Sequence, residues 1–544
     1  MNYLRKIFFF QVIFLLNLWA YAQNDSVPKW GAWSVWGDMG NGMYANPVLP
    51  ADFSDIDCIR VGKDYYAISS TFQYSPGMII LHSKDLVNWE IAGHAVNDIT
   101  QISPEMNYDR MNRYGKGIWA GAIRYHDKKF WIYFGTPDEG YFMTTAKKPE
   151  GPWEPLHQIF NEKGWDDGCP FWDDDGQAYF IGTHFSDGYK IHLFKMTADG
   201  KTLLKETDKV IYQSKGSEAN KLYKINGNYY HFFSEVKTDG RAVMMERSEN
   251  IWGPYSKPKQ LSATQKKFNE PNQGGIVQTT NGDWYFLTHH GTGDWSGRIM
   301  SLLPVKWVDG WPIPGEVGTD TIGQMVWRSS IPVKKQKKMF PQTGDDFNEK
   351  KLGQQWEWNH QPKKENWSLL EREGWLRMYA SKPIEPGNML KAANTLTQRS
   401  FRTNANEAIL KIDISNMANG QHAGLSHFGS PNYSAVGIIC KDSGKFVEFN
   451  LKGKITDGLA ISGNDLWLRS IWGLDGKSEY SYSTDGKYYI TIGNVYQMMW
   501  GSYRGDRLAV YSYNDTNEEG YVDVDFFHYN FTAPVFNQVN SILK

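Results

Sequence analysis

Three acidic residues in the first half of the chain could share proton-transfer chemistry. Asp55, Asp167 and Glu218 each stand at the start of a short apolar or aromatic run. Cleavage of a glycosidic bond needs one carboxyl group that stays protonated and donates to the leaving oxygen, and one carboxylate that activates water or attacks directly. A third acid nearby can raise the pKa of the donor by like-charge repulsion. Because a single Asp at such a position is often only a turn cap, the hypothesis requires a fold that brings the three together.

A hairpin pattern that recurs five times gives these acids equivalent positions. Each copy is a polar turn followed by two adjacent aromatic residues. The pairs begin at Tyr65, Phe130, Tyr179, Tyr229 and Trp284. Each turn separates two short apolar or aromatic runs, as in a β-hairpin. Hairpins repeated about every 50 residues without intervening helices are typical of propeller blades. We therefore predict a five-bladed β-propeller over residues 28–332, with the three acids facing its central funnel.

The repeat does not continue into the C-terminal part of the chain. Lys334 to Lys338 are a short basic run, and we predict a linker over residues 333–342. From there to residue 540, alternating strands continue without the 50-residue period, which favours a separate β-sandwich. We expect no helix of any length in either domain, so the predicted fold class is all-β.

The composition restricts the partners of the protein. The 544-residue chain has a formal net charge of −2, which does not suggest a nucleic-acid or membrane-surface partner. It contains 23 Trp, 31 Tyr and 28 Phe. Exposed aromatic rings commonly cover the apolar faces of sugars, although most of these rings must belong to the sheet cores. The three cysteines, Cys58, Cys169 and Cys440, are too few for a disulfide framework, and we expect buried free thiols.

The N-terminus has the pattern of a secretory signal peptide over residues 1–22. Arg5 and Lys6 precede an apolar run, and Ala20-Tyr21-Ala22 provides a small-x-small cleavage site. The apolar run is short for a bilayer span. We expect an exported protein, periplasmic or secreted, without membrane insertion.

The order of the motifs resembles glycoside hydrolase family 43 over the whole mature chain. The matching segments are Asn46-Pro47-Val48-Leu49-Pro50 before Asp55, Gly117-Ile118-Trp119-Ala120, Asp167 with Asp173-Asp174-Asp175-Gly176, Glu218 before Leu222-Tyr223-Lys224, and Trp307-Val308-Asp309-Gly310-Trp311-Pro312. The resemblance implies that Asp55 is the general base, Asp167 the pKa modulator and Glu218 the general acid. It also implies an exo-acting, inverting enzyme that releases terminal α-L-arabinofuranosyl or β-D-xylosyl residues from plant cell-wall glycans such as xylan. The segment from Asp345 resembles the sandwich that follows the propeller in this family, which implies a concanavalin A-like domain.

Substrate contacts are predicted at three further residues. Arg298 matches the sugar-binding arginine of the family, and the alternative is an ion pair that closes a blade. Phe72 and Trp119 could form a platform under the terminal sugar, although a role in the core is equally compatible with their positions. His427 and Phe428 in the C-terminal segment are weaker candidates for the rim of the site.

Some residues depart from the family pattern. The proline that often follows the base is Ile56, and Asp57 is a rival base because residues two apart on a strand share a face. We favour Asp55 on its match to the motif. The Gly-Pro-His that often follows the acid is Ala219-Asn220-Lys221. Gln273 stands where many members have a calcium-ligating histidine, so we predict no metal and no other cofactor, structural calcium being the one candidate.

Two other functions fit parts of the pattern. A retaining fructan-type hydrolase also uses a five-bladed propeller with three acids, but its Asn-Asp-Pro-Asn-Gly and Arg-Asp-Pro motifs are absent from this sequence. A propeller that binds carbohydrate without cleaving it is the alternative outside enzymes. Retention of all three acids favours catalysis over binding alone.

Overall fold

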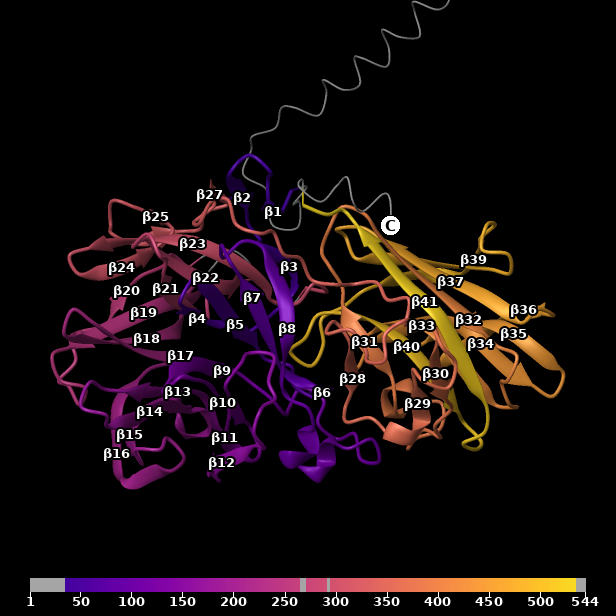
Figure 1. The fold of residues 1–544 in the computed structure, drawn as a ribbon, viewed down its shortest axis with the longest axis horizontal. Helices are drawn as coiled ribbons and strands as arrows, with labels where there is room; N and C mark the ends of the chain where they lie inside the picture. The colour runs from indigo at the N-terminus through magenta and orange to yellow at the C-terminus, as the bar shows by residue number, and fades with distance from the viewer. Residues whose placement is uncertain (1–34, 265–270, 291–293, 535–544) are drawn as a thin grey trace, which may run out of the picture.

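The computed structural model describes residues 35–264, 271–290 and 294–534, so the predicted signal peptide lies outside the described residues. The described chain is almost entirely β-structure (Figure 1). Its only helices are five 3-10 turns of three residues: η1 (Ile99–Gln101), η2 (Pro104–Met106), η3 (Phe185–Asp187), η4 (Lys364–Asn366) and η5 (Met389–Lys391). The all-β prediction is therefore confirmed. No helix among the described residues is long and apolar enough to cross a bilayer.

Five antiparallel sheets follow one another along the N-terminal part of the described chain. Each contains four strands in sequence order. They are β4 (Asp57–Val61), β5 (Asp64–Ser69), β7 (Gly77–Ser83) and β8 (Trp89–Val96); β9 (Gly121–His126), β10 (Lys129–Thr136), β11 (Gly140–Ala146) and β12 (His157–Phe160); β13 (Trp165–Trp172), β14 (Ala178–His184), β15 (Lys190–Met196) and β16 (Leu203–Gln213); β17 (Glu218–Ile225), β18 (Asn228–Lys237), β19 (Gly240–Ser248) and β20 (Lys259–Gln260); and β21 (Gly274–Gln278), β22 (Trp284–His290), β23 (Ile299–Val308) and β24 (Trp311–Pro314). Each predicted aromatic pair lies in the second strand of one of these sheets.

The N-terminal strand joins the last of the five sheets. β3 (Leu49–Asp52) pairs antiparallel with β23, so that Asp52 lies opposite Ile299. The start of the propeller is thereby tied to its end, and the residues after β3 lie beside those before β23. Asp55 and Arg298, far apart in sequence, come together for this reason. β1 (Gly37–Asp38), β2 (Met43–Ala45) and β27 (Arg328–Ser330) form a small separate sheet, and β25 (Glu316–Val317) pairs with β26 (Gly323–Gln324).

The C-terminal domain is a sandwich of two larger sheets (Figure 1). The eight-stranded sheet has the order β36 (Lys454–Ile461), β35 (Gly444–Leu451), β34 (Tyr433–Lys441), β33 (Gln421–Phe428), β40 (Arg507–Asn514), β31 (Leu396–Arg399), β28 (Glu357–Asn359) and β6 (Tyr74–Ser75). The seven-stranded sheet has the order β29 (Trp367–Ser368), β30 (Leu376–Tyr379), β41 (Tyr521–Phe531), β32 (Asn406–Asp413), β37 (Asp465–Trp472), β38 (Lys477–Ser483) and β39 (Ile490–Gln497). Residues 331–344, around the predicted linker, contain no strand.

The two domains share a sheet edge and a buried set of charges. The edge strand β6 lies in the chain between β5 and β7 of the first propeller sheet and pairs with β28 of the sandwich. Next to it, the fully buried Glu357 accepts from Arg399 at 2.8 Å and from Arg507 at 2.5 Å. His94 of the propeller lies 3.1 Å from the same carboxylate. Glu357, Arg399 and Arg507 all belong to the sandwich, so within this set the contact from His94 is the one that joins the two domains.

Candidate active site

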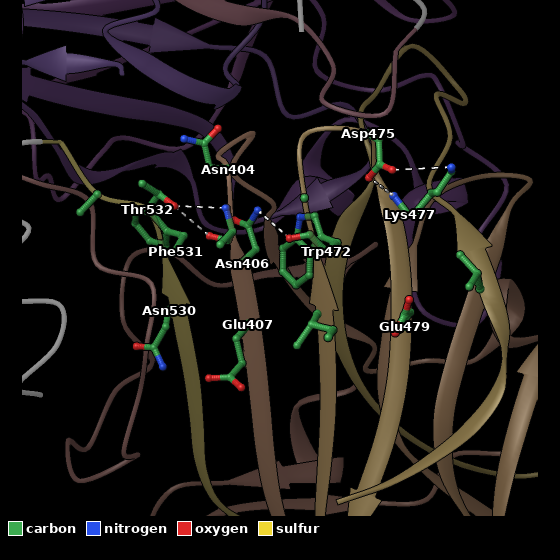
Figure 2. A pocket seen from close by; sticks show the side chains of 15 residues that line it. Asn404, Asn406, Glu407, Trp472, Asp475, Lys477, Glu479, Asn530, Phe531 and Thr532 are labelled. Atoms are coloured by element: carbon green, nitrogen blue, oxygen red, sulfur yellow. Dashed lines mark hydrogen bonds and ion pairs between the residues drawn. The ribbon is translucent and has the colours of Figure 1, made fainter. Parts of the chain in front are cut away.

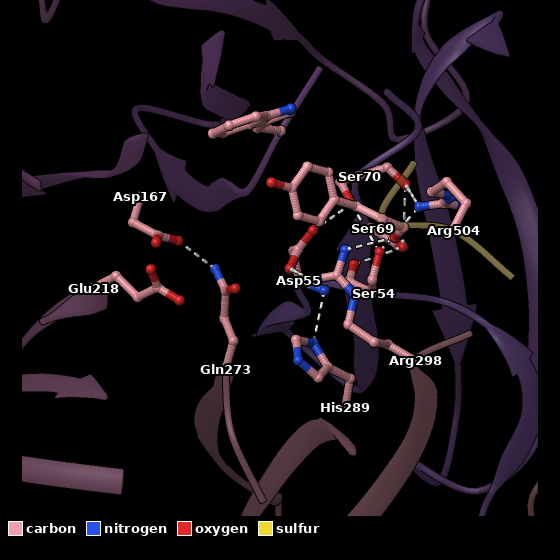
Figure 3. Close-up of polar contacts among 12 residues, drawn as sticks. Ser54, Asp55, Ser69, Ser70, Asp167, Glu218, Gln273, His289, Arg298 and Arg504 are labelled. Atoms are coloured by element: carbon pink, nitrogen blue, oxygen red, sulfur yellow. Dashed lines mark hydrogen bonds and ion pairs between the residues drawn. The ribbon is translucent and has the colours of Figure 1, made fainter. Parts of the chain in front are cut away.

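Three of the five propeller sheets place one acid each at the start of their first strand. Asp55 precedes β4, Asp167 is the third residue of β13, and Glu218 is the first residue of β17. The ladder is irregular at two of these points, between Asp166 and Cys169 and between Glu218 and Lys221. A bulge of this kind redirects side chains at the end of a strand. Figure 3 shows the three carboxyl groups facing a common space, as the repeat positions predict.

The backbone around these acids adopts the left-handed conformation. The φ angle is 58° at Asp55, 52° at Asp167 and 67° at Ala219, next to Glu218. Non-glycine residues rarely adopt this region and pay of order 1–3 kcal/mol for it, although Asp tolerates it better than most. Two of the three acids and the neighbour of the third thus have this costly backbone conformation, which indicates that the fold gives up local stability to direct these side chains.

Asp57, the rival base, lies in a different environment from Asp55. Its carboxylate is fully buried, and Oδ2 accepts from Arg124 at 2.7 Å and from the Ile123 amide at 2.9 Å. The argument that Asp55 and Asp57 share a strand face fails, because β4 begins only at Asp57 and Asp55 has a left-handed backbone. Asp57 therefore bonds strand β4 of the first sheet to strand β9 of the second.

Asp55 is an ionised carboxylate held by several donors. Only 5% of the residue is exposed. Oδ1 accepts from Arg298 at 2.7 Å, and Oδ2 accepts from the Ser70 hydroxyl at 2.5 Å. Its backbone amide donates to Nδ1 of His289 at 2.8 Å. Burial opposes ionisation, but Arg298 and the other donors outweigh it and hold the pKa of Asp55 below its usual value. Because it is ionised, this carboxylate can accept a proton from a water molecule.

Asp167 is also buried, and Figure 3 shows it on the same side of the common space as Glu218, across from Asp55. Its Oδ1 accepts from the side-chain amide of Gln273 at 2.5 Å. Burial raises the pKa of Asp167, Lys221 and the Ala219 amide oppose that rise, and the negative charge of Asp55 adds to it. This position lets Asp167 act on Glu218 by like-charge repulsion.

Glu218 has the opposite pKa shift from Asp55. Burial raises its pKa to about 7; Arg241 acts against this rise, and the charges of Asp167 and Asp55 add to it. Oε1 accepts from Arg241 at 2.9 Å, and the Glu218 side chain remains 30% exposed. At neutral pH and below, a carboxyl group of this kind holds a proton that it can donate.

Two of the three acids therefore have opposite roles: Asp55 is the proton acceptor and Glu218 the proton donor. Two carboxyl groups whose environments move their pKa values apart are the expected feature of a general acid and base pair. Asp55 remains charged at a pH where Glu218 is largely protonated. The geometry can thus deprotonate a water molecule on one side of a bond and protonate a leaving oxygen on the other.

The residues predicted to contact substrate lie around the same space. Arg298 forms the ion pair with Asp55, and its Nη2 donates to the Tyr503 carbonyl at 3.3 Å. Phe72 is almost fully buried, with a ring centroid 6.3 Å from that of Tyr503. Trp119 is half-buried and lies 6.1 Å from Tyr503 and 5.7 Å from Phe185. The aromatic surface beside the acids thus includes Tyr503, a sandwich residue that is 57% exposed.

His427 and Phe428 do not reach the rim of the site, contrary to the sequence-based expectation. Both are fully buried in the sandwich. His427 bonds to Asp506 at 2.7 Å and to the Ser470 hydroxyl at 2.9 Å. As neighbours on strand β33 they point to opposite faces of its sheet. His427 faces β37 of the other sheet, and Phe428 packs in a cluster with Met389 and Tyr433, so neither side chain is open to a sugar.

Several residues of the site have no local signal in the sequence. Ser70 and Arg241 contact two of the acids, and Tyr503 and Arg504 come from a segment more than 430 residues from Ser70. None belongs to a repeat motif. Tyr503 stands at no spacing that relates it to the propeller repeats, so only the tertiary structure places it at the site.

The residues near the acids do not fit a calcium site. Calcium requires six to eight oxygen ligands, usually with several carboxylates. Among the described residues, no group of three or more His, Cys, Asp or Glu could hold a metal. Gln273 presents its amide nitrogen to Asp167, and the ammonium group of Lys221 is fully buried beside the same acid.

The predicted free thiols are confirmed. Cys58, Cys169 and Cys440 are all unpaired, and the first two are buried. Nη2 of Arg124 contacts the Cys169 sulfur at 2.8 Å, while its Nη1 bonds to Asp57.

A separate cavity of about 910 Å³ lies on the sandwich, and none of the three acids lines it. Figure 2 shows its lining, where the Asn406 amide donates to the Trp472 carbonyl at 3.4 Å. Asp475 and Lys477 pair at its margin. In Figure 2, dashed lines join polar groups of this lining to one another. None of these lines joins two carboxyl groups that could act as general acid and general base.

Comparisons with known proteins match both domains. The family model described as "Glycosyl hydrolases family 43" matches residues 44–312. The model described as "Beta xylosidase C-terminal Concanavalin A-like domain" matches residues 344–530. A beta-xylosidase of Formosa agariphila is 36% identical over 549 aligned residues, which cover 92% of each chain. A non-reducing end alpha-L-arabinofuranosidase of Bacteroides ovatus is 31% identical over 64% of this chain and 67% of that protein.

A solved structure agrees with this match. The bifunctional GH43-CE protein of Bacteroides eggerthii superposes with a TM-score of 0.80 at 29% identity. The alignment covers 92% of this chain and 64% of that protein. The likeness thus extends over the propeller and the sandwich together.

Proposed function

The chain belongs to glycosyl hydrolases family 43, and from this premise we propose that it is an inverting glycosidase in which Asp55 is the base and Glu218 the acid. The family predicted from the sequence motifs is confirmed, and the protein is an exo-acting glycoside hydrolase. The observation that carries the proposed roles is the opposite shift of two pKa values: that of Asp55 is lowered, and that of Glu218 is raised to about 7.

In the proposed step, Asp55 takes a proton from a water molecule, whose oxygen attacks the anomeric carbon. The bond from that carbon to the leaving oxygen breaks, and Glu218 gives its proton to this oxygen. Asp167 keeps Glu218 protonated before the step. Arg298, which already donates to Asp55, has a second role in binding sugar hydroxyls, and Phe72 and Trp119 contact the apolar face of the terminal sugar.

The proposed substrates are terminal β-D-xylosyl and α-L-arabinofuranosyl residues of plant cell-wall glycans such as xylan. The similar proteins named beta-xylosidase and alpha-L-arabinofuranosidase support this choice. These two sugars present similar hydroxyl and leaving-group geometry, so one site can serve both. The signal-peptide pattern of residues 1–22 supports export, to the periplasm or outside the cell, where such polymers occur.

The test is hydrolysis of 4-nitrophenyl β-D-xyloside and 4-nitrophenyl α-L-arabinofuranoside by the full chain, alongside Asp55→Asn and Glu218→Gln. We expect release from at least one substrate and a loss of at least about a hundredfold in kcat/KM for Asp55→Asn. Glu218→Gln should lose more on xylobiose than on the nitrophenyl substrate, because nitrophenolate leaves with little need for a proton. Activity unchanged in both variants would refute the assignment, and no release by the unmodified protein would favour a carbohydrate-binding propeller.

A further inference from the structure

Both oxygens of the Asp55 carboxylate are supported by residues that are themselves held by the sandwich domain. Oδ1 accepts from Arg298, whose Nη2 donates to the Tyr503 carbonyl. Oδ2 accepts from Ser70, whose carbonyl accepts from Nη1 of Arg504 at 3.0 Å. Tyr503 and Arg504 precede strand β40, so a single sandwich segment bonds to the supports of both carboxylate oxygens.

A chain of hydroxyl groups connects Arg504 to Asp55. Nη1 of Arg504 donates to the Ser54 hydroxyl at 3.0 Å. The hydroxyl oxygens of Ser54 and Ser70 are 2.9 Å apart, and Ser70 donates to Asp55 at 2.5 Å. A guanidinium group can only donate. The ionised Asp55 carboxylate can only accept, so Ser70 donates to Asp55 and accepts the hydrogen of Ser54, while a lone pair of Ser54 accepts from Arg504.

Arg504 is itself fixed by the propeller. Its Nε lies 2.9 Å from Oδ2 of Asp52, and both side chains are almost fully buried. The Gly505 amide donates to the same oxygen at 3.1 Å. The amide of Arg298 donates to Oδ1 of Asp52 at 3.0 Å. Asp52 thus sets the positions of both arginines that act on Asp55.

We propose that Arg504 is a positioning residue for Asp55, which makes the sandwich domain part of the apparatus of the catalytic base. This inference rests on the proposed function, because it takes Asp55 as the base. The fixed direction of the hydroxyl chain stabilises the ionised carboxylate. It also disfavours a protonated Asp55 that donates to Ser70, so the proton from water goes to a lone pair on the substrate side.

The charged groups that face Asp55 come from four elements. His289 belongs to the fifth sheet and Arg298 directly precedes its strand β23, Arg504 comes from the sandwich, Asp166 and Asp167 from the third sheet and Glu218 from the fourth. Burial lowers the pKa of His289 to about 3, so this histidine stays neutral through the weakly acidic range. The pKa of Asp167 is raised as well, so the acid limb reports on Asp55 through the difference between a variant of its hydroxyl chain and a control variant that leaves Asp167 in place.

The decisive variant is Ser54→Ala, with Ser69→Ala as its matched control. Both serines are fully buried. Ser69 donates to the Ser54 carbonyl at 2.7 Å and has no bond to the Asp55 carboxylate. Loss of the Ser54 hydroxyl should raise the pKa of the base, so the acid limb of kcat/KM should move up by about half to one pH unit. Ser69→Ala should leave that limb in place, and KM should change little in either variant.

A double-variant cycle separates the chain of hydroxyls from other effects of Arg504. Arg504→Met should move the acid limb in the same direction, and Ser54→Ala added to it should cause little further shift, because the link is already broken. Ser54→Thr, which keeps the hydroxyl, should restore the profile. Thermal unfolding of each variant checks that it folds. If Arg504→Met does not fold, the comparison of the acid limbs of Ser54→Ala and Ser69→Ala still tests the inference.

Two results would overturn the inference: an acid limb in Ser54→Ala that matches the Ser69→Ala control, or shifts from Arg504→Met and Ser54→Ala that simply add. Asp55→Asn, measured beside them, distinguishes the levels of failure. If Asp55→Asn keeps its activity, the base itself is wrongly assigned. If Asp55→Asn is inactive while Ser54→Ala has an unchanged profile, the proposed function stands and only the role of Arg504 fails.

Discussion

Replacement of Arg241 by methionine should extend the activity of the enzyme to higher pH. Arg241 forms an ion pair with Glu218, with Nη2 2.9 Å from Oε1. It favours the ionised form of the acid and so holds its pKa down. Methionine retains much of the apolar stem but removes the charge. Because catalysis by Glu218 requires the protonated form, a higher pKa moves the alkaline limb of the profile upward.

The size of the shift follows from the contact distance. At 2.9 Å, two unit charges interact by about 1.4 kcal/mol in a water-like dielectric and by about 6 kcal/mol at an effective dielectric of 20. The two side chains are 23% and 30% exposed, so solvent screening favours the lower part of this range. One pKa unit corresponds to about 1.4 kcal/mol. We therefore expect a rise of about one to three units above the value of about 7.

The assay is kcat/KM against pH on xylobiose, whose poor leaving group makes protonation by Glu218 necessary. Arg247→Met is the matched control, because Arg247 lies in the same strand, β19, but stacks on Trp311. The control should keep the alkaline limb of the unmodified enzyme. An alkaline limb of Arg241→Met that stays in place or moves to lower pH would refute the electrostatic reasoning about Glu218.

Three further predictions follow from the same contacts. Asp167→Asn removes a negative charge that raises the pKa of Glu218, so the alkaline limb on xylobiose should move to lower pH, and an upward move would contradict the modulator role. Glu357→Gln leaves Arg399 and Arg507 buried without their carboxylate, and chemical denaturation should show a loss of about 3–5 kcal/mol; an unchanged stability would show that this pair is not needed. Because the three cysteines are unpaired, a reductant should not change the thermal unfolding midpoint, and a lower midpoint would reveal a disulfide.

The propeller could be predicted from the sequence because its units are local. Each hairpin combines a turn with an aromatic pair within about ten residues, and five copies at similar intervals indicate one architecture. The equivalent positions of Asp55, Asp167 and Glu218 in three copies gave the acids without any long-range information. The strand-period argument failed at Asp57, because it assumed a regular strand where Asp55 has a left-handed backbone.

The contribution of the sandwich to the site could not be predicted. The pairing of β6 with β28 joins residues almost 300 positions apart, and the bond from Arg504 to Ser54 joins residues 450 positions apart. Such contacts depend on how two domains pack, which no local pattern encodes. The misplaced expectation for His427, a buried core residue, has the same origin, because alternation along a strand does not tell which face meets the other domain.

The central claim is that Asp55 activates water on one side of the anomeric carbon while Glu218 protonates the leaving oxygen on the other. Proton NMR of the sugar that forms first from 4-nitrophenyl β-D-xyloside, recorded before mutarotation, tests it most directly. The account predicts α-xylose as the first product, because a single displacement inverts the anomeric centre. β-Xylose as the first product would show retention through a covalent intermediate and would contradict the assignment of Asp55 as a general base.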